Sequence, residues 1–487
     1  MNNMNRRTFI RNSLLATASV SALPQLGWTA PKPTDRVRGA NEDIRIAVVG
    51  FNGRGQSHID GFRKIKGVRI VALCDVDQTV LDKAVKIFAD RGEPVEAYRD
   101  IRKLLENPDI DAVSFATPNH WHSLCTIWAV QAGMDVYVEK PISHNVWEGR
   151  QAVEAARKYG RIVQAGTQSR SSYGIREAFE WARAGNIGKI LRARGLCYKR
   201  RPSIGKVDGP QPIPPSIDYD LWCGPAPKEP LMRKRLHYDW HWVWPTGNGD
   251  LGNQGVHQVD MCRWALGVNE LSPSVFSIGG RLGYEDDGTT PNTQIIFHDY
   301  KPAPLIFEVR GLPSASDSSK MDNYRGAGVG IVVECEGGYL LIPNYSSGIV
   351  HDKDGKEIKK FSGANDHFEN FIKAVRSRKS SDLNADILEG HLSAGLCHTA
   401  NISYRLGRKH SPEEIRDAAR NNKDVAEALG RMEEHLAANQ VDTKKTPATL
   451  GAVLKMNPRM ERFAENAAAD ELLTRNYRAP FVVPAKV

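Results

Sequence analysis

Short apolar segments alternate with amphipathic ones in the first third of the chain. The apolar segments have strand length and little polar interruption, as expected for strands that a parallel sheet buries on both faces; they span 44–49, 68–73, 112–116, 136–138 and 162–165. Segments with helical periodicity, such as 79–91 and 151–158, lie between them. This alternation predicts an α/β fold that begins with a Rossmann-type, doubly wound parallel sheet.

The pattern changes after residue 166. Strand-like stretches then dominate, at 275–282, 293–298, 305–309, 330–335 and 339–343. They predict a C-terminal α+β domain with a large, mostly antiparallel sheet. We expect a first domain at 43–166, a second at 167–407 and a C-terminal extension at 408–487, whose end could wrap a neighbouring subunit.

A glycine turn follows the first strand directly. It consists of Gly50, Phe51, Asn52, Gly53, Arg54 and Gly55, and it opens a segment at 56–66 that can be helical. Backbone N–H groups at that helix N-terminus would face a pyrophosphate, although Asn52 replaces the middle glycine of G-x-G-x-x-G. The turn predicts a dinucleotide-binding site, and the alternative is an ordinary tight β–α turn.

Asp75 ends the second strand, where an acidic residue binds the ribose diol of a dinucleotide. Its carboxylate would repel a 2′-phosphate, so the predicted cofactor is NAD and NADP is disfavoured. Further strand ends carry Thr117, Pro118, Asn119 and His122, then Glu139 and Lys140. Loops after the carboxyl ends of parallel strands bind ligands, so all six are predicted to lie at the cofactor.

Lys140 is the first candidate for catalysis. It lies at a strand end and is followed by Pro141, and desolvation beside the nicotinamide would disfavour its ammonium form. The amine could then take a hydroxyl proton while a hydride leaves for the cofactor. The alternative is a surface lysine at a strand end.

The combination of GFNGRG, TPNHWH, EKP and a later G-x-H-x-x-D resembles the glucose-fructose oxidoreductase, inositol dehydrogenase and rhizopine-catabolism (Gfo/Idh/MocA) family, over about 44–407. The resemblance implies a Rossmann domain for NAD and a second domain for substrate binding and oligomerisation. It also implies that Lys140 lies by the nicotinamide, and that an aspartate and a histidine in the pattern D-x-G-x-H complete the site. Here these positions are Asn253 and His257.

His257 is predicted as a general base whose pKa lies near the working pH. Asn253 can form a hydrogen bond with the substrate or with Lys140 but can carry neither a proton nor a charge. Asp260 lies three residues after His257, close to the same helix face, and is a predicted substrate contact. Gln168 and Arg170, which leave the first sheet, are predicted to reach the substrate too.

The most aromatic segment spans 236–244. If it is extended, His237, Asp239 and His241 share one face, and Tyr238, Trp240 and Trp242 share the other. One reading is a metal site on the first face. We favour the other, an aromatic wall in which Trp240 stacks on a sugar ring and His241 donates a hydrogen bond, and we predict no metal.

The Pro-rich stretch at 202–230 is too long for an ordinary loop. Such a segment is either a lid over a site or an arm used in assembly. We favour the arm slightly, in a homo-oligomer that is a dimer or a tetramer.

The overall composition excludes several classes of protein. With 487 residues, 41% hydrophobic and 25% charged, the chain is globular. A net charge of +9 and basic clusters at 199–201 and 233–235 do not form a nucleic-acid module, so no nucleic-acid partner is predicted. Seven scattered cysteines favour neither a zinc site nor a disulfide framework. No segment after residue 30 predicts stable membrane insertion.

The N-terminus carries a twin-arginine pattern, NRRTFI at 5–10, followed by a mild apolar run at 14–23. We expect a signal peptide at 1–30, a linker at 31–42 and export to the periplasm by the twin-arginine route. The alternative is a cytoplasmic protein with a chance pair of arginines.

Three functions remain open at this stage. The favoured one is an NAD-dependent oxidoreductase that acts on a secondary hydroxyl of a sugar or glycoside, with C3 of a pyranose as a hypothesis. The second is a glycosidase that oxidises its substrate transiently and eliminates the aglycone. The third is a non-catalytic sugar-binding protein that retains NAD as structure; Asn253 argues for it, and Lys140 and His257 argue against it.

Overall fold

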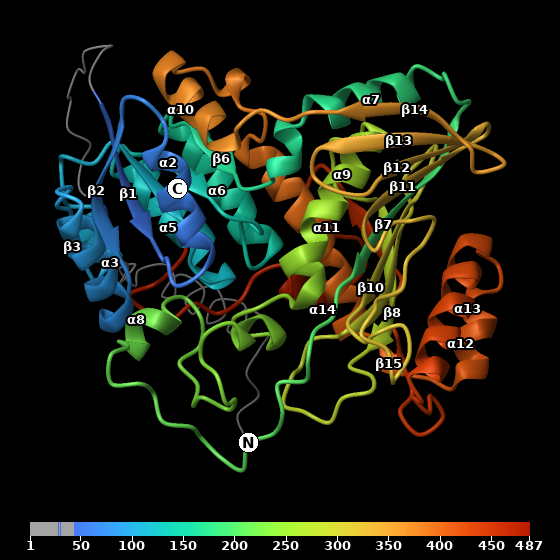
Figure 1. The fold of residues 1–487 in the computed structure, drawn as a ribbon. Coiled ribbons are helices and arrows are strands. Elements are labelled where there is room, and N and C mark those ends of the chain that lie inside the picture. The colour runs from blue at the N-terminus through green and yellow to red at the C-terminus, as the bar shows by residue number, and fades with distance from the viewer. Residues whose placement is uncertain (1–27, 29, 31–42) are drawn as a thin grey trace, which may run out of the picture.

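The computed structural model describes Trp28, Ala30 and residues 43–487, so the twin-arginine pattern lies outside the described residues. Two sheets, one of six strands and one of twelve, lie side by side with helices on both faces of each (Figure 1). The predicted fold class is therefore confirmed. No helix among the described residues has the length and apolar character needed to cross a membrane.

The first sheet has the strand order β3-β2-β1-β4-β5-β6, and all of its neighbouring strands are parallel. The chain leaves β1 in one direction and returns to its other side at β4, so a crevice opens between the loops that follow these strands. The strands are β1 Ile44–Val49, β2 Val68–Cys74, β3 Glu96–Tyr98, β4 Ala112–Phe115, β5 Asp135–Val138 and β6 Val163–Ala165.

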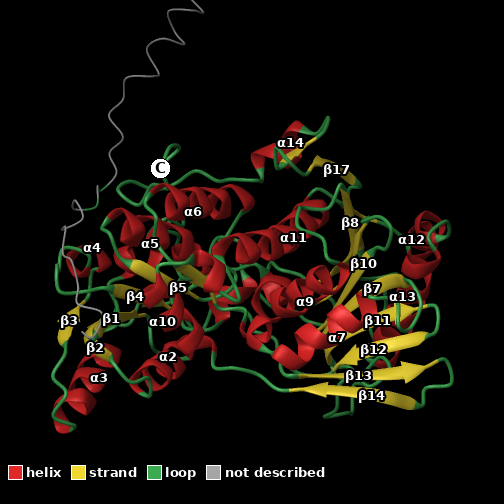
Figure 2. Ribbon diagram, turned by 90° about the horizontal axis from the view of Figure 1, so that it is seen from above, coloured by secondary structure: helices red, strands yellow, loops and turns green. Residues whose placement is uncertain are grey.

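Helices from both parts of the chain cover this sheet. One face carries α2, α3 and α10, which bury Phe62, Phe88 and Phe371 against it, and the other carries α4, α5 and α6 (Figure 2). The apolar side of α10 is thus part of the core. The helices are α2 Arg54–Arg63, α3 Gln78–Asp90, α4 Ile101–Leu104, α5 Asn119–Gln131, α6 Val146–Lys158 and α10 His367–Ser377.

The second sheet is antiparallel except for the neighbours β7 and β10, which are parallel. Helices α7 Tyr173–Arg183, α9 Val256–Leu266 and α11 Ile387–Arg405 bury apolar side chains against one face. The strands are β7 Ile190–Tyr198, β8 Ser274–Gly280, β9 Thr293–His298, β10 Leu305–Arg310, β11 Val329–Cys335, β12 Gly338–Ile342, β13 Ser347–Asp352 and β14 Glu357–Ser362.

The C-terminal extension continues this second domain. It adds the short strands β15 Arg408–Lys409, β16 Thr449–Leu450 and β17 Leu454–Asn457 to the sheet, and β18 Arg462–Phe463 pairs with β17. Its helices α12 Pro412–Ala419 and α13 Lys423–Ala438 cover the other face (Figure 1).

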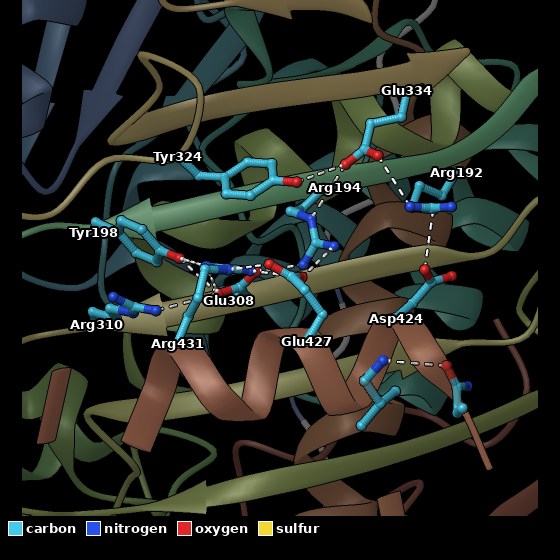
Figure 3. A network of polar contacts seen from close by, with 12 residues as sticks. Arg192, Arg194, Tyr198, Glu308, Arg310, Tyr324, Glu334, Asp424, Glu427 and Arg431 are labelled. Atoms are coloured by element: carbon cyan, nitrogen blue, oxygen red, sulfur yellow. Dashed lines mark hydrogen bonds and ion pairs between the residues drawn. The ribbon is translucent and has the colours of Figure 1, made fainter. Parts of the chain in front are cut away.

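A polar network fixes α13 to this face (Figure 3). Arg431 of α13 donates to the Glu308 carboxylate on β10 and, at 2.9 Å, to the Tyr198 hydroxyl on β7. Arg194 on β7 also pairs with Glu308, at 2.7 Å. Burial alone would raise the pKa of Glu308, but the hydrogen bond and charge of Arg431 and the charge of Arg194 lower it. Glu308 is therefore a buried, ionised anchor for the helix.

The end of the chain, after α14 Ala467–Glu471, returns to the first domain. Phe481 is fully buried against Trp121 of α5, at 5.4 Å between ring centres, and the Tyr477 hydroxyl donates to Glu148 of α6 at 2.9 Å. Lys158 donates to the carbonyl of Val487 at 2.6 Å. The tail thus packs on its own chain, where the sequence suggested a neighbouring subunit.

Because Phe481 is buried, Phe481→Ala should lower the free energy of unfolding by about 3 kcal/mol, through lost apolar contact and the cavity left behind. Denaturant titration of the purified protein measures this change. Met460→Ala, at a residue that is 69% exposed, is the control and should change stability little. Equal stability of the two variants would mean that the tail contributes nothing to the core.

Candidate functional site

A cavity of about 360 Å³ lies at the carboxyl ends of the strands of the first sheet. Its walls come from the loops after β1, β2, β4 and β5 and from the second domain, at 237–241 and Asn253. The predicted cofactor residues on its wall are Gly50, Phe51, Asn52, Gly53, Arg54, Asp75, Thr117, Pro118, Asn119, His122, Glu139 and Lys140. Loops that are distant in sequence therefore form one site.

The glycine turn has the geometry of a phosphate cradle. Gly50 has φ +75°, and a Cβ there would lie 3.0 Å from the backbone N of Thr117. Gly55 lies under the turn, where a Cβ would come within 2.2 Å of the Gly50 carbonyl oxygen. Helix α2 begins at Arg54 without a side-chain cap or an acidic residue in its first turn. Its free N–H groups fit the pyrophosphate of a dinucleotide.

Asp75 is fixed beside this turn. Its carboxylate accepts the N–H of Phe51 at 3.1 Å and the N–H of Asp77 at 3.0 Å. Burial raises the pKa of Asp75, and the two backbone hydrogen bonds oppose the rise. The carboxylate faces the cavity one strand away from the turn, where the ribose of a dinucleotide would lie.

Hydrogen bonds hold the loop after β4 in place. The ring nitrogens of His122 lie 2.6 Å from the carbonyl oxygen of Pro141 and 2.8 Å from that of Thr117. Asn119 donates to the side-chain oxygen of Asn248 in the second domain at 2.9 Å. These contacts hold the loops after β4 and β5 together and join them to the second domain.

Glu139 is a buried carboxylate with several donors. Arg54 donates to it at 2.8 Å, and the His58 ring nitrogen lies 3.1 Å away. Burial favours the neutral acid, but the hydrogen bond from His58 and the charge of Arg54 hold the pKa of Glu139 well below its usual range. Gln168, which is outside the cavity wall, also donates to this carboxylate at 3.3 Å.

The Lys140 amine is buried beside this anion and donates to the backbone carbonyl of Asn253 at 3.1 Å. Among residues 43–487, no carboxylate lies within ion-pair distance of it. Burial, together with the charges of Arg54 and Lys199, lowers the pKa of Lys140 despite the opposing charge of Glu139. The neutral amine is therefore favoured more at this strand end than in an ordinary, solvated lysine.

The segment that carries Asn253 is a π-helix, Leu251–Gly255, which runs into α9. The Asn253 side chain donates to Asp250 at 3.3 Å, while its carbonyl oxygen accepts from Lys140. The contact with the lysine is thus made by the backbone, and such π turns recur at functional sites.

Three other predicted residues lie behind the wall. Arg170 and Asp260 form a buried ion pair at 2.8 Å, and Ser393 donates to Asp260 at 2.6 Å. Neither lines the cavity, so their polar groups satisfy each other within the second domain rather than face a ligand. His257 is also absent from the lining, and burial beside the charge of Lys140 lowers its pKa to about 3. The expectation that His257 titrates near the working pH is wrong.

The aromatic segment is not extended. Asp239–Trp242 forms a 3-10 turn, so the predicted alternation of faces is wrong. His237 contacts Asp77 at 3.2 Å, and Asp239 accepts from Arg235 at 2.9 Å. Within the described part of the chain, no group of three or more metal-binding side chains exists. Trp240 and His241 stack at 3.6 Å and both line the cavity.

The Pro-rich segment closes the cavity, in accord with the lid alternative. Its helix α8 Tyr219–Cys223 contributes Leu221 and Trp222 to the wall. The indole N–H of Trp121 donates to the Leu221 carbonyl at 3.1 Å, and the backbone N–H of Asp218 donates to the Val76 carbonyl at 3.2 Å. Sequence reasoning missed Trp121, Leu221 and Trp222 as wall residues, although TPNHWH and the length of the loop marked their segments.

Asp75→Asn should weaken NAD binding about tenfold and reduce the preference for NAD over NADP, because a charged acceptor for the ribose is lost. Fluorescence titration with each reduced nucleotide measures both effects. Asp82→Asn, on the exposed side of α3, is the matched control. An unchanged preference would remove Asp75 from the cofactor site.

Solved structures with this fold have low sequence identity to the chain. The WlbA dehydrogenase from Bordetella pertussis, in complex with NADH and UDP-GlcNAcA, is 19% identical, with a TM-score of 0.54 over 73% of this chain and 94% of that one. An oxidoreductase domain protein from Kribbella flavida is 17% identical, with a TM-score of 0.55 over 74% and 96%. These likenesses establish the fold.

Curated relatives match part of the chain. A glycosyl hydrolase family 109 protein from Shewanella putrefaciens is 29% identical over 230 residues, which are 43% of this chain and 49% of the relative. An alpha-N-acetylgalactosaminidase from Shewanella oneidensis is 29% identical over 209 residues, 39% and 45% of the two chains. The match thus spans about half the length of these relatives.

Two family models complete the comparison. The oxidoreductase family model with an NAD-binding Rossmann fold matches residues 44–167, and the model for the C-terminal alpha/beta domain of that family matches 189–312. Together they cover about half of the chain, in the order and at the places where the two sheets begin. The chain belongs to the Gfo/Idh/MocA family of NAD-binding oxidoreductases.

Proposed function

We propose that this protein is an oxidoreductase that transfers a hydride between a secondary hydroxyl carbon of a sugar or glycoside and a tightly held NAD. The observation that carries the proposal is the Lys140 amine. It is buried without an ion pair among residues 43–487, and it shares a cavity with the glycine turn and Asp75.

Each part of the site has a separate role in this reaction. NAD, when bound, supplies the hydride acceptor. The glycine turn and Asp75 orient the nucleotide, and the Asn253 carbonyl orients the Lys140 amine. As the carbinol C–H bond breaks, the neutral amine takes the proton of the hydroxyl group and becomes an ammonium. In the reverse direction, the ammonium returns that proton to the oxygen of the alcohol.

The wall opposite the glycine turn suits a sugar ring. Trp240 and His241 present a stacked aromatic surface at the cavity, and such surfaces pack against the C–H face of a ring. Leu221 and Trp222 add apolar surface to the same cavity. The names of the curated relatives and the nucleotide sugar in the WlbA complex support a carbohydrate substrate. We propose C3 of a pyranose as the oxidised carbon.

A second candidate is an NAD-dependent glycosidase. The curated relatives named as glycosyl hydrolase family 109 proteins and alpha-N-acetylgalactosaminidase favour it. The same lysine would serve a transient oxidation that permits elimination of the aglycone, after which the hydride returns to the sugar. Released aglycone without net change in the redox state of the cofactor would identify this activity.

We also propose that the protein is exported folded to the periplasm and forms a dimer or a tetramer. The twin-arginine pattern at 5–10 supports export, because that route carries proteins that have already bound a cofactor. Light scattering of the native protein tests the assembly, and fractionation of cells tests the location.

Lys140→Met should reduce turnover by at least about a hundredfold while NAD stays bound, because the acceptor for the hydroxyl proton is lost and the nucleotide contacts remain. Turnover with an active sugar and the nucleotide content of the purified protein measure the two effects. Lys83→Met, on the exposed side of α3, is the control. Normal turnover in Lys140→Met would contradict the assignment.

The rate of sugar oxidation should depend on pH through Lys140. The amine accepts a proton only when neutral, so kcat/KM should rise with pH and level off above its pKa. Burial lowers that pKa, so the plateau should begin below the range of an ordinary lysine. A pH–rate profile measures the midpoint. A midpoint at the ordinary lysine value, or a profile that is flat with pH, would exclude Lys140 as the proton acceptor.

A further inference from the structure

Tyr238 has an unusual backbone conformation at the wall of the cavity. Its φ is +67°, in the left-handed region, which costs a residue other than glycine about 1–2 kcal/mol. Its side chain remains 48% exposed and lines the cavity beside Trp240 and His241. Because Tyr238 is not buried in the core, packing contributes little to offset this backbone strain. Two polar contacts of Tyr238 hold it in this conformation instead.

The first contact fixes the tautomer of His241. The carbonyl oxygen of Tyr238 accepts the backbone N–H of His241 at 3.2 Å and lies 2.5 Å from its ring Nδ1. A carbonyl oxygen only accepts, so Nδ1 carries the hydrogen. Burial lowers the pKa of His241 to about 3, so the ring is neutral near pH 7. Nε2 is therefore a bare acceptor, with no donor to it among residues 43–487.

The second contact fixes the Tyr238 hydroxyl. Its oxygen accepts from Arg201 Nη1 at 2.7 Å, and the guanidinium is itself held by Asp250 at 2.7 Å and 2.9 Å. A guanidinium has no acceptor, so the hydroxyl proton of Tyr238 is not used in this contact. No acceptor for that proton is found in the described part of the chain. The Tyr238 hydroxyl can therefore donate a hydrogen bond to a ligand.

The two rings that carry the donor and the acceptor are neighbours. The rings of Tyr238 and His241 are 4.8 Å apart between centres, and both side chains line the cavity that contains Lys140. Hydrogen bonds link Tyr238 through Arg201, Asp250 and Asn253 to the Lys140 amine, so the pair lies toward the lysine rather than toward the adenosine end. Only a group that can accept and donate at once satisfies both side chains, and a hydroxyl group does so.

We propose that Tyr238 and His241 together bind a second hydroxyl group of a pyranose substrate, different from the hydroxyl that Lys140 serves. Tyr238 donates to the oxygen of this hydroxyl, which in turn donates to Nε2 of His241. Tyr238 is thereby a specificity-determining residue that selects a polyhydroxylated ring over an analogue that lacks this hydroxyl. The inference rests on the proposed function and deepens it.

The test is a binding experiment that needs no turnover. Methyl pyranosides of the gluco and galacto series, and each of their monodeoxy derivatives, are titrated against the holoprotein while the fluorescence of bound NADH is followed. In the native protein, one monodeoxy derivative should bind about tenfold more weakly than its parent. In Tyr238→Phe, the parent and this derivative should bind within about twofold of each other. Tyr173→Phe, at an exposed tyrosine of α7 outside the cavity, should keep the native discrimination.

A second variant tests the acceptor. His241→Asn keeps a donor for the Tyr238 carbonyl but removes Nε2, and it should lose discrimination at the same hydroxyl position as Tyr238→Phe. The inference is overturned if Tyr238→Phe keeps the native discrimination, if the two variants lose it at different positions, or if no pyranoside binds the native holoprotein. The proposed function fails separately, if sugars bind with this discrimination but no hydride transfer occurs with any of them.

Discussion

The buried carboxylate of Glu139 is the contact on which the geometry of the cavity depends. A buried charge is costly unless donors surround it, so Arg54 and His58 of α2 must converge on the residue that follows β5. Gly166 must also lack a side chain, because a Cβ there would lie 3.0 Å from this carboxyl group. The glycine turn and Lys140 are thereby held at a fixed spacing.

Residues of the second domain complete the cavity that the first domain begins. A chain of hydrogen bonds runs from the Lys140 amine through Asn253 to Asp250, and from Asp250 through Arg201 to Tyr238. It joins Lys140 to the aromatic wall, so the two sides of the cavity cannot shift independently. The lid and the C-terminal tail reinforce this closure, because Arg478 of the tail donates to Asp220 of α8. The walls of the cavity thus belong to one connected framework.

Local patterns predicted most of the fold, because buried strands, glycine turns and strand-end residues carry their structural reason within a few positions. The strand-end residues predicted to bind the cofactor lie together at one cavity. The sequence pattern does not predict which residues pair when they are far apart in the chain. Arg170 and Asp260 are 90 residues apart and satisfy each other, and the Tyr238 turn depends on His241 folding back onto its carbonyl. The Asn253 contact with Lys140 comes from the backbone of a π turn, which no side-chain pattern encodes.

The central claim is that a hydride passes between a sugar carbon and NAD held in this cavity. The most direct measurement mixes the purified holoprotein with a pyranoside deuterated at its ring carbons, then releases the nucleotide and determines its mass. Deuterium on the nicotinamide is the predicted result, and loss of this label in Lys140→Met would place the transfer at the site described. A nucleotide that never gains deuterium from any bound sugar would contradict the account.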